Sequence, residues 1–322
     1  MSTFKIAQLS DLHFFSAKDV GVMDFFTKRA FSLLNGKMSS NRVFDVSAVP
    51  TMLQDAYNNS VNTVLITGDS TCLGTPEEFS LCKEALLQSP FYVDDSPQPT
   101  IADNPYPIST NNQIFVTLGN HDDLVPSKKQ NYQVLRPFIP REFPRVFSTP
   151  HIDILNLNSA FGQILPMSAK GKVDITQRNT ARTLLNNRSS VNPLFTMLHH
   201  SPTRRTLPTH ALLEEEAFER FIGGNDEAGN FLSNSHVSDY VLHGHTHVPS
   251  VQCPFTSCNS MVVDCGSSTQ TFRSSGPSYF TYEFLKEGDE SKLLQIVQRS
   301  FSKEEVVETV WWSVNDPSPS NQ

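Results

Sequence analysis

Five short segments of this 322-residue sequence carry side chains that commonly bind metal ions. They are Asp11-Leu12-His13, Gly68-Asp69, Gly119-Asn120-His121-Asp122, His199-His200 and Gly244-His245-Thr246-His247. Asp, Asn and His supply oxygen and imidazole nitrogen ligands, a set suited to Mn, Fe, Zn or Co, and none of the segments contains a cysteine. The residue types therefore predict a metal site with oxygen and nitrogen ligands.

Each segment directly follows a short apolar run that is typical of a buried strand. The runs are residues 5–9, 63–67, 114–118, 194–198 and 240–242. Parallel strands that are buried on both faces read as near-continuous apolar runs, and α/β sheets bind ligands beyond the carboxyl ends of their strands. We therefore expect the five segments to converge on one edge of the fold.

The number of candidate ligands indicates two metal ions rather than one. Two such ions need about seven or eight protein ligands, and a carboxylate must bridge them to hold them about 3.5–4 Å apart. Asp69 stands alone after a glycine at a strand end, so we predict that it is the bridge. Asp11 and His13 are two residues apart, as are His245 and His247, so on an extended backbone each pair would leave the same face.

The order of these segments resembles the calcineurin-like metallophosphoesterase superfamily, whose pattern is D-x-H, G-D, G-N-H-D/E, H and G-H-x-H. The resemblance extends from Phe4 to about Phe301 and includes Gly171, Gln177 and Cys265-Gly266-Ser267. It implies an α/β fold, a four-layer αββα sandwich of two mixed β-sheets, with the metal site at the carboxyl ends of the strands.

The resemblance also implies which residues bind the metals. The ligands of one metal would be Asp11, His13, Asp69 and His247, and those of the second would be Asp69, Asn120, His199 and His245. Neighbouring residues on a strand point to opposite faces, so only one of the two adjacent histidines can face the metals, and the family pattern favours His199.

The remaining site residues are predicted to serve catalysis and substrate binding. His121 resembles the family histidine that contacts phosphate and protonates the leaving group. Asp122 is expected to orient His121, because histidines in metal sites usually donate their second ring N–H to a carboxylate or carbonyl. Asn120 and His200 are the predicted substrate-binding residues, and His200 could instead support the metal ligands.

A purely structural interpretation competes with this one. Each segment alone would more often be a turn or a solvated loop end, since Gly-Asn and Gly-Asp are common turn dipeptides. Five matches in the family's order, each after a predicted strand, nevertheless favour a metal site. The residues outside the pattern are interpreted as structural or surface residues, namely Asp123, His151, His210, His236 and His243.

The composition indicates one enzyme domain, residues 1–314, followed by a disordered tail, residues 315–322. The start lacks the apolar region of a signal peptide, and five cysteines without metal-finger spacing indicate reduced thiols, so a cytoplasmic location is expected. A net charge of −8 argues against general nucleic-acid binding. The sequence does not indicate an oligomeric state.

Helical periodicity appears at about 46–59, 77–88, 174–189 and 212–222, and a further amphipathic helix is predicted within the insertion 20–44. Five basic residues stand against two acidic ones between positions 18 and 42. Such a helix covers an apolar ligand, lies on a membrane surface or packs on the domain. Its apolar face consists of Met23, Phe26, Ala30, Phe31, Leu33, Leu34 and Met38.

The expected reaction is hydrolysis of a phosphodiester or pyrophosphate bond by metal-activated water. Two divalent ions are implied, Mn²⁺ first, with Fe, Zn, Co or Mg as alternatives. The expected substrate is a phosphorylated small molecule or a lipid nucleotide.

The insertion resembles that of the UDP-2,3-diacylglucosamine pyrophosphatases of lipid A biosynthesis. This resemblance favours hydrolysis of UDP-2,3-diacylglucosamine to lipid X and UMP, with peripheral contact at the inner face of a membrane. One subgroup of those enzymes has Arg where His121 stands, whereas a second subgroup keeps the histidine. One alternative is a cyclic-nucleotide or glycerophosphodiester phosphodiesterase. A second is an inactive scaffold of the same fold, which is less favoured because none of the family's metal ligands is missing from this sequence.

Overall fold

The computed structural model describes residues 1–16, 18, 43–92, 108–109, 113–124, 131–136, 138–161, 169–188, 191–203, 210–230, 238–255, 258–271, 276–302 and 305–316. The predicted helical insertion 20–44 lies outside these residues except at its last two positions. Most of the predicted tail 315–322 lies outside them as well.

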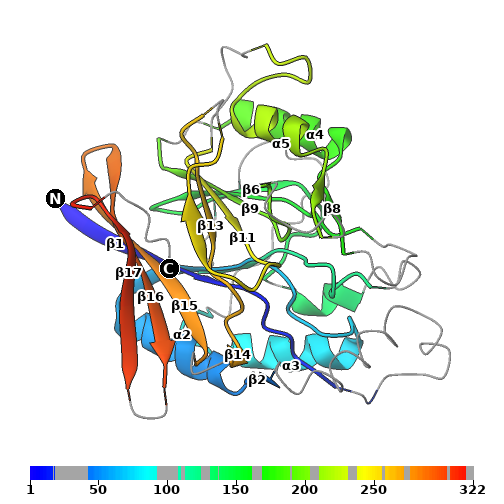
Figure 1. Cartoon of the computed structure of the whole chain (residues 1–322), viewed down its shortest axis with the longest axis vertical. Helices are drawn as coiled ribbons and strands as arrows, with labels where there is room; N and C mark the ends of the chain where they lie inside the picture. Colours follow the sequence, from blue (N-terminus) through cyan, green and yellow to red (C-terminus); the bar gives the residue numbers. More distant parts are fainter. Residues whose placement is uncertain are drawn as a thin grey trace.

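Two mixed β-sheets form the centre of the fold (Figure 1). The first sheet has the order β17 (Val306–Ser313), β16 (Glu290–Phe301), β15 (Ser278–Glu287), β1 (Ser2–Leu9), β3 (Val61–Ile66) and β5 (Ile114–Val116). The second has the order β12 (Ser250–Gln252), β13 (Met261–Asp264), β11 (Tyr240–His243), β9 (Leu194–Met197), β7 (Asp153–Asn156), β6 (Arg145–Ser148) and β4 (Ile108–Ser109). The strands before the five ligand segments are parallel neighbours, β1, β3 and β5 in one sheet and β9 and β11 in the other.

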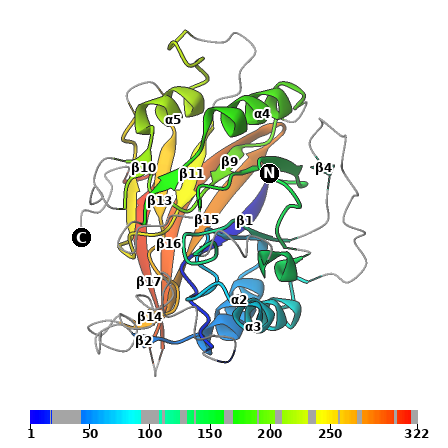
Figure 2. The same cartoon turned by 90° about the vertical axis from the view of Figure 1, so that its right-hand side faces the viewer.

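Helices cover the outer face of each sheet, and the two inner faces pack against each other (Figure 2). The first sheet is covered by α2 (Ala48–Asn58), α3 (Pro76–Leu87) and the 3₁₀ helix η3 (Asn131–Leu135). The second is covered by α4 (Ile175–Asn186) and α5 (Glu215–Ile222). The predicted four-layer αββα sandwich is therefore confirmed.

Alternation along the strands produces these layers. In β3, Leu65 packs between the sheets, whereas its neighbours Val64 and Ile66 pack against the helices outside. The same alternation in β1 sends Ile6 inward and Ala7 outward. Both faces of the strands are apolar because both are covered, which is why the runs in the sequence are continuous rather than alternating.

The predicted helix 212–222 is wrong at its beginning. Leu212–Leu213 form the short strand β10, which pairs in parallel with β8 (Gly171–Lys172). Glu214 then adopts a left-handed conformation with φ of 60°, and the helix begins only at Glu215. Pairing with β8 therefore overrides the helical periodicity at these positions, because the periodicity reports only which residues are buried.

A second short pair joins β2 (Val43–Phe44) to β14 (Gln270–Thr271) at the same end of the molecule as the ligand loops. All five cysteines are free thiols. Within the described part of the chain, no helix has the length and apolar character that crossing a bilayer requires.

Candidate metal centre

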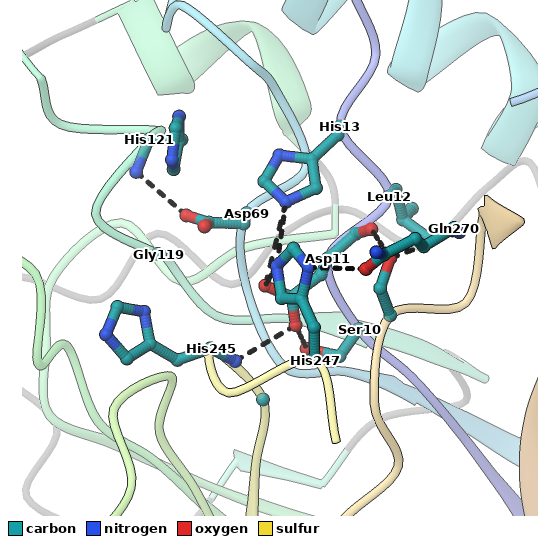
Figure 3. A network of polar contacts seen from close by, with 12 residues as sticks. Ser10, Asp11, Leu12, His13, Asp69, Gly119, His121, His245, His247 and Gln270 are labelled. Atoms are coloured by element: carbon teal, nitrogen blue, oxygen red, sulfur yellow. Dashed lines mark hydrogen bonds and ion pairs between the residues drawn. The ribbon is translucent and has the colours of Figure 1, made fainter. Parts of the chain in front are cut away.

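The loops that follow β1, β3, β5 and β11 meet at one place (Figure 3). The loop that follows β9 brings His199 to the same place, beside Asp69 and His245. Backbone hydrogen bonds tie neighbouring loops together. The amides of Asp11 and His13 donate to the carbonyls of Gly68 and Asp69, each at 3.0 Å. In the second sheet the amide of Gly244 donates to the carbonyl of His199 at 3.1 Å.

A first group of ligand atoms comes from Asp11, His13 and His247. Asp11 Oδ1 lies 3.1 Å from His247 Nε2 and 3.8 Å from His13 Nε2. The two imidazole nitrogens, His13 Nε2 and His247 Nε2, are 3.2 Å apart. Three donor atoms therefore face a common point, and two of the three side chains are buried.

A second group comes from Asp69, His199 and His245, and Asn120 stands beside it. His199 Nε2 lies 3.2 Å from Asp69 Oδ2 and 3.2 Å from Asn120 Oδ1. Gly119 allows this approach, because a Cβ there would lie 2.1 Å from Asp69 Oδ1. The structure thus brings together all seven predicted metal ligands, in two adjoining groups.

The spacing of these donors fits metal coordination. Two ligands bound to one ion at about 2.0–2.1 Å stand about 3 Å apart, close to the separations within each group. One buried atom of the second group, His245 Nε2, has no hydrogen-bond partner among the described residues. Since a buried polar atom without a partner costs free energy, a cation bound between these side chains would satisfy this atom.

The electrostatic field of the carboxylates favours positive charge at this place. Burial alone would lower the pKa of His199, but the charges of Asp69 and Asp11 raise it to about 10. The pKa of His13, in contrast, is lowered to about 3, chiefly by burial. The site therefore combines buried negative charge with a neutral imidazole, as binding of divalent metals requires.

The orientation of the ligands is set by partners behind them. The Nδ1–H of His199 donates to the Thr67 carbonyl at 2.8 Å, so that Nε2 is the ring nitrogen that faces Asp69. His247 Nδ1 pairs with Gln270 Oε1 at 2.8 Å in the same way. Such partners fix the ring tautomer and are typical of metal-binding histidines.

Five of the candidate ligands have positive φ, which is uncommon for residues other than glycine. They are Asp11 (52°), His13 (52°), Asp69 (50°), His245 (72°) and His247 (58°). The extended backbone expected for the two Asp-x-His and His-x-His pairs is therefore wrong. Each pair reaches the site instead through left-handed residues in a tight loop, where the backbone hydrogen bonds between loops hold it.

The expected contact between Asp122 and His121 is not present. The Asp122 carboxylate accepts hydrogen bonds from the amide and hydroxyl of Thr71 at 3.0 and 2.8 Å and from the amide of Gly119 at 2.9 Å. It therefore joins the loops that follow β3 and β5. The His121 ring donates from Nδ1 to the Cys72 carbonyl at 2.7 Å, so its Nε2 is available to a substrate.

His200 lies behind the ligands. Its side chain is fully buried, its Nδ1 is 2.9 Å from the hydroxyl of Ser159, and its ring centroid is 4.6 Å from that of His245. Gly171 makes room for it, because a Cβ there would lie 2.2 Å from His200 Cγ. This position favours support of the metal ligands over contact with substrate.

His210 has no place in the family pattern, and the sequence predicts a structural or surface residue there. Its ring lies beside the second group, 5.4 Å from that of His245 between centroids. It follows a stretch of sequence without strand or helix periodicity, so no pattern pointed to it. His243 is buried next to Asp264, His151 stacks on Phe4, and residue 236 lies outside the described part of the chain.

The family model of the calcineurin-like phosphoesterases matches residues 4–249, which include all five ligand segments. The chain belongs to this family. It is therefore a metal-dependent phosphoester hydrolase with two adjoining groups of candidate metal ligands. Comparison of this phosphoesterase with curated proteins finds no significant match.

Solved structures of the same kind are similar to this phosphoesterase. A dimetal phosphatase from Danio rerio superposes with a TM-score of 0.52 at 10% identity, covering 95% of this chain and 98% of that one. A purple acid phosphatase from yellow lupin (Lupinus luteus) seeds has a TM-score of 0.47 at 10% identity, over 99% of this chain and 52% of that one. Phosphopantetheinyl hydrolase from Mycobacterium tuberculosis has a TM-score of 0.41 at 10% identity, over 82% and 89%. At this identity, the Danio rerio structure supports the fold alone.

Proposed function

We propose that this phosphoesterase hydrolyses a phosphodiester or pyrophosphate bond with two divalent metal ions, Mn²⁺ first among them. The observation that carries the proposal is the pair of adjoining ligand groups, in each of which the donor atoms lie within 4.8 Å of one another. Asp69 is the bridging ligand in this proposal, since its carboxylate belongs to the second group and is predicted to reach the first. Bound there, two such ions would activate water and neutralise charge on the phosphoryl oxygens.

The remaining steps fall to side chains of the protein. His121 in its imidazolium form donates the Nε2 proton to the leaving oxygen and becomes the neutral ring, whose Nδ1–H stays bonded to the Cys72 carbonyl. Asn120, beside His199, would hold the second ion and orient the phosphoryl group. Asp122 keeps the His121 loop in register with the Asp69 loop, which preserves the geometry that proton transfer needs.

Metal analysis and a simple diester test this reaction class. Purified protein is stripped with a chelator, reloaded with Mn²⁺, Zn²⁺, Co²⁺ or Mg²⁺, and assayed on bis(p-nitrophenyl) phosphate. We expect two ions per chain, no hydrolysis after chelation, and recovery that is greatest with Mn²⁺. Full binding of two ions without hydrolysis of any phosphate ester would instead identify an inactive scaffold of the same fold.

Within this class, we propose UDP-2,3-diacylglucosamine as the substrate, with lipid X and UMP as products. The support is the sequence of the 20–44 insertion, because the apolar face of its predicted helix and its local positive charge suit a two-tailed lipid at a membrane surface. The protein would then act in the cytoplasm, at the inner face of a membrane. The alternative is a cyclic-nucleotide or glycerophosphodiester phosphodiesterase, which the Gly119-Asn120-His121-Asp122 motif also suits.

A screen of UDP-2,3-diacylglucosamine, cyclic AMP and glycerophosphodiesters separates these substrates. The triple change of Phe26, Phe31 and Leu34 to Ser should impair turnover of the lipid nucleotide and leave bis(p-nitrophenyl) phosphate hydrolysis intact. Sedimentation with anionic liposomes should occur at low salt and fail at high salt, because attraction of basic residues to the surface is screened. Equal loss on both substrates, with a lowered melting temperature, would show that the apolar face is part of the core.

A further inference from the structure

One aromatic side chain stands at the metal centre without a role in the proposed reaction. Phe44, in β2, is half-buried, and its ring centroid lies 4.4 Å from that of His13 at an interplanar angle of 47°. It also meets the ring of His247 edge to face at 6.0 Å. An apolar ring thus borders the first ligand group and keeps part of its surface exposed.

The position of Phe44 is set by the same elements that hold the ligands. Phe44 pairs with Gln270 across the two-stranded sheet of β2 and β14, and the Gln270 side chain binds His247. The amide of the next residue, Asp45, donates to the Thr269 carbonyl at 2.7 Å. The Thr269 hydroxyl in turn donates to the carbonyl of Leu12, in the metal-binding loop, at 2.9 Å. Phe44 is therefore held by a short strand that is bonded to the metal-binding loop.

Phe44 and His121 border His13 on different sides. The His121 ring meets His13 edge to face at 5.0 Å, whereas no ring contact joins Phe44 to His121 in the described part of the chain. In Figure 3, His121 and Gln270, the pairing partner of Phe44, lie to either side of His13 and His247. If His121 faces the leaving oxygen, Phe44 faces the group that remains on phosphorus.

We propose that Phe44 is a specificity-determining residue that stacks against a flat ring, such as a nucleobase, in the organic group retained on phosphorus. The proposal rests on the proposed function, because it takes the side of the leaving group from the role of His121. A phenyl ring offers nothing to the charged phosphate, but it binds the face of a base well. Phe44 thereby favours nucleotide esters over simple alkyl esters.

Binding of two matched phosphate monoesters tests this role without requiring turnover. UMP and methyl phosphate carry the same phosphate and differ only in the organic group. With Mn²⁺-loaded protein in calorimetry, Phe44→Ala should weaken UMP binding about 5- to 150-fold, the range of one base–aromatic stack, and leave methyl phosphate binding unchanged. Phe44→Trp should retain UMP binding, whereas Phe44→Leu should weaken it.

The control is Tyr57→Ala, an aromatic side chain of α2 that is 51% exposed and has no ring contact with the site. It should change neither affinity. Equal weakening of both monoesters by Phe44→Ala, loss of bound metal, or full affinity in Phe44→Leu would overturn the proposal, since each would show that the ring only packs against the ligands. Failure of the proposed function is detected by a separate measurement: wild-type protein would then not hydrolyse bis(p-nitrophenyl) phosphate.

Discussion

Asp69→Asn changes a single group at the place where the two ligand groups adjoin. Asp69 Oδ2 lies 3.2 Å from His199 Nε2, and its Oδ1 accepts the amide of His121 at 2.8 Å. Asn has the same shape and keeps one oxygen for the His121 amide, so the loops should stay in place. What the change removes is the negative charge and the second oxygen that a bridging ligand needs.

The expected loss in kcat follows from the buried negative charge of Asp69. The residue is 1% exposed, and burial alone would raise the pKa of its carboxyl, but the charges of His199 and His121 hold that pKa well below its ordinary value. The carboxylate is therefore ionised at neutral pH. If its loss removes about 4–6 kcal/mol of the stabilisation that two ions give to the transition state, kcat falls about 10³–10⁴-fold, since each 1.4 kcal/mol is a factor of ten.

The assay combines turnover, metal content and thermal unfolding. We expect Asp69→Asn to bind at most one ion per chain and to hydrolyse bis(p-nitrophenyl) phosphate at the reduced rate even in excess Mn²⁺. The matched control is Asp153→Asn, because Asp153 is equally buried but pairs with Arg188 away from the site. It should lower the melting temperature and retain both ions. Wild-type turnover and two bound ions in Asp69→Asn would refute the assignment of the whole site.

Three further variants test other parts of the structure. His121→Ala should keep both ions and lose about 10²–10⁴-fold in kcat, less for a nitrophenolate leaving group, and equal losses for good and poor leaving groups would indicate positioning instead. Gly171→Ala should destabilise the fold by about 1–3 kcal/mol in denaturant unfolding, because its Cβ meets the His200 ring, and unchanged stability would contradict this. Asp55→Asn should lower the free energy of unfolding by about 1 kcal/mol at pH 7, and a difference that does not narrow towards pH 2 would contradict the reasoning. Burial raises the pKa of Asp55, but hydrogen bonds from Arg299 lower it below its ordinary value, so this stability is present above about pH 4 and is lost as the pH falls through the folded pKa.

The strands and the gathering of the ligand segments could be predicted because both depend on local sequence. An apolar run followed at once by Asp, Asn or His indicates a covered strand and its carboxyl end, and the parallel order then brings the ends together. The start of α5 could not be predicted in this way. Leu212 fits the apolar face of a helix and also fits the strand that pairs with Gly171, and only the distant partner decides between them.

Contacts between loops could not be predicted from local sequence patterns for the same reason. The His121 ring donates to the Cys72 carbonyl rather than to the neighbouring Asp122, because the Asp122 carboxylate already accepts hydrogen bonds from the loop that follows β3. Phe44 lies in β2 and His210 lies two residues before β10, and these strands of two residues each leave no periodicity in the sequence. Their place depends on pairing with β8 and β14, which lie far away along the chain.

Several candidate ligands have a left-handed backbone conformation, and this explains why many hydrogen bonds around the site hold the loops in place. A non-glycine residue in this conformation costs about 1–2 kcal/mol, although Asp and His tolerate it better than most. Asp11 is held in this conformation by the hydrogen bond that its amide donates to the Gly68 carbonyl at 3.0 Å. The Ser10 hydroxyl and the His245 amide donate to Asp11 Oδ2 at 2.6 and 3.0 Å. One carboxylate oxygen thus fixes two ligand loops and leaves Oδ1 for the metal. The strain is local and the hydrogen bonds that offset it come from other loops, so the geometry of the site depends on the complete fold.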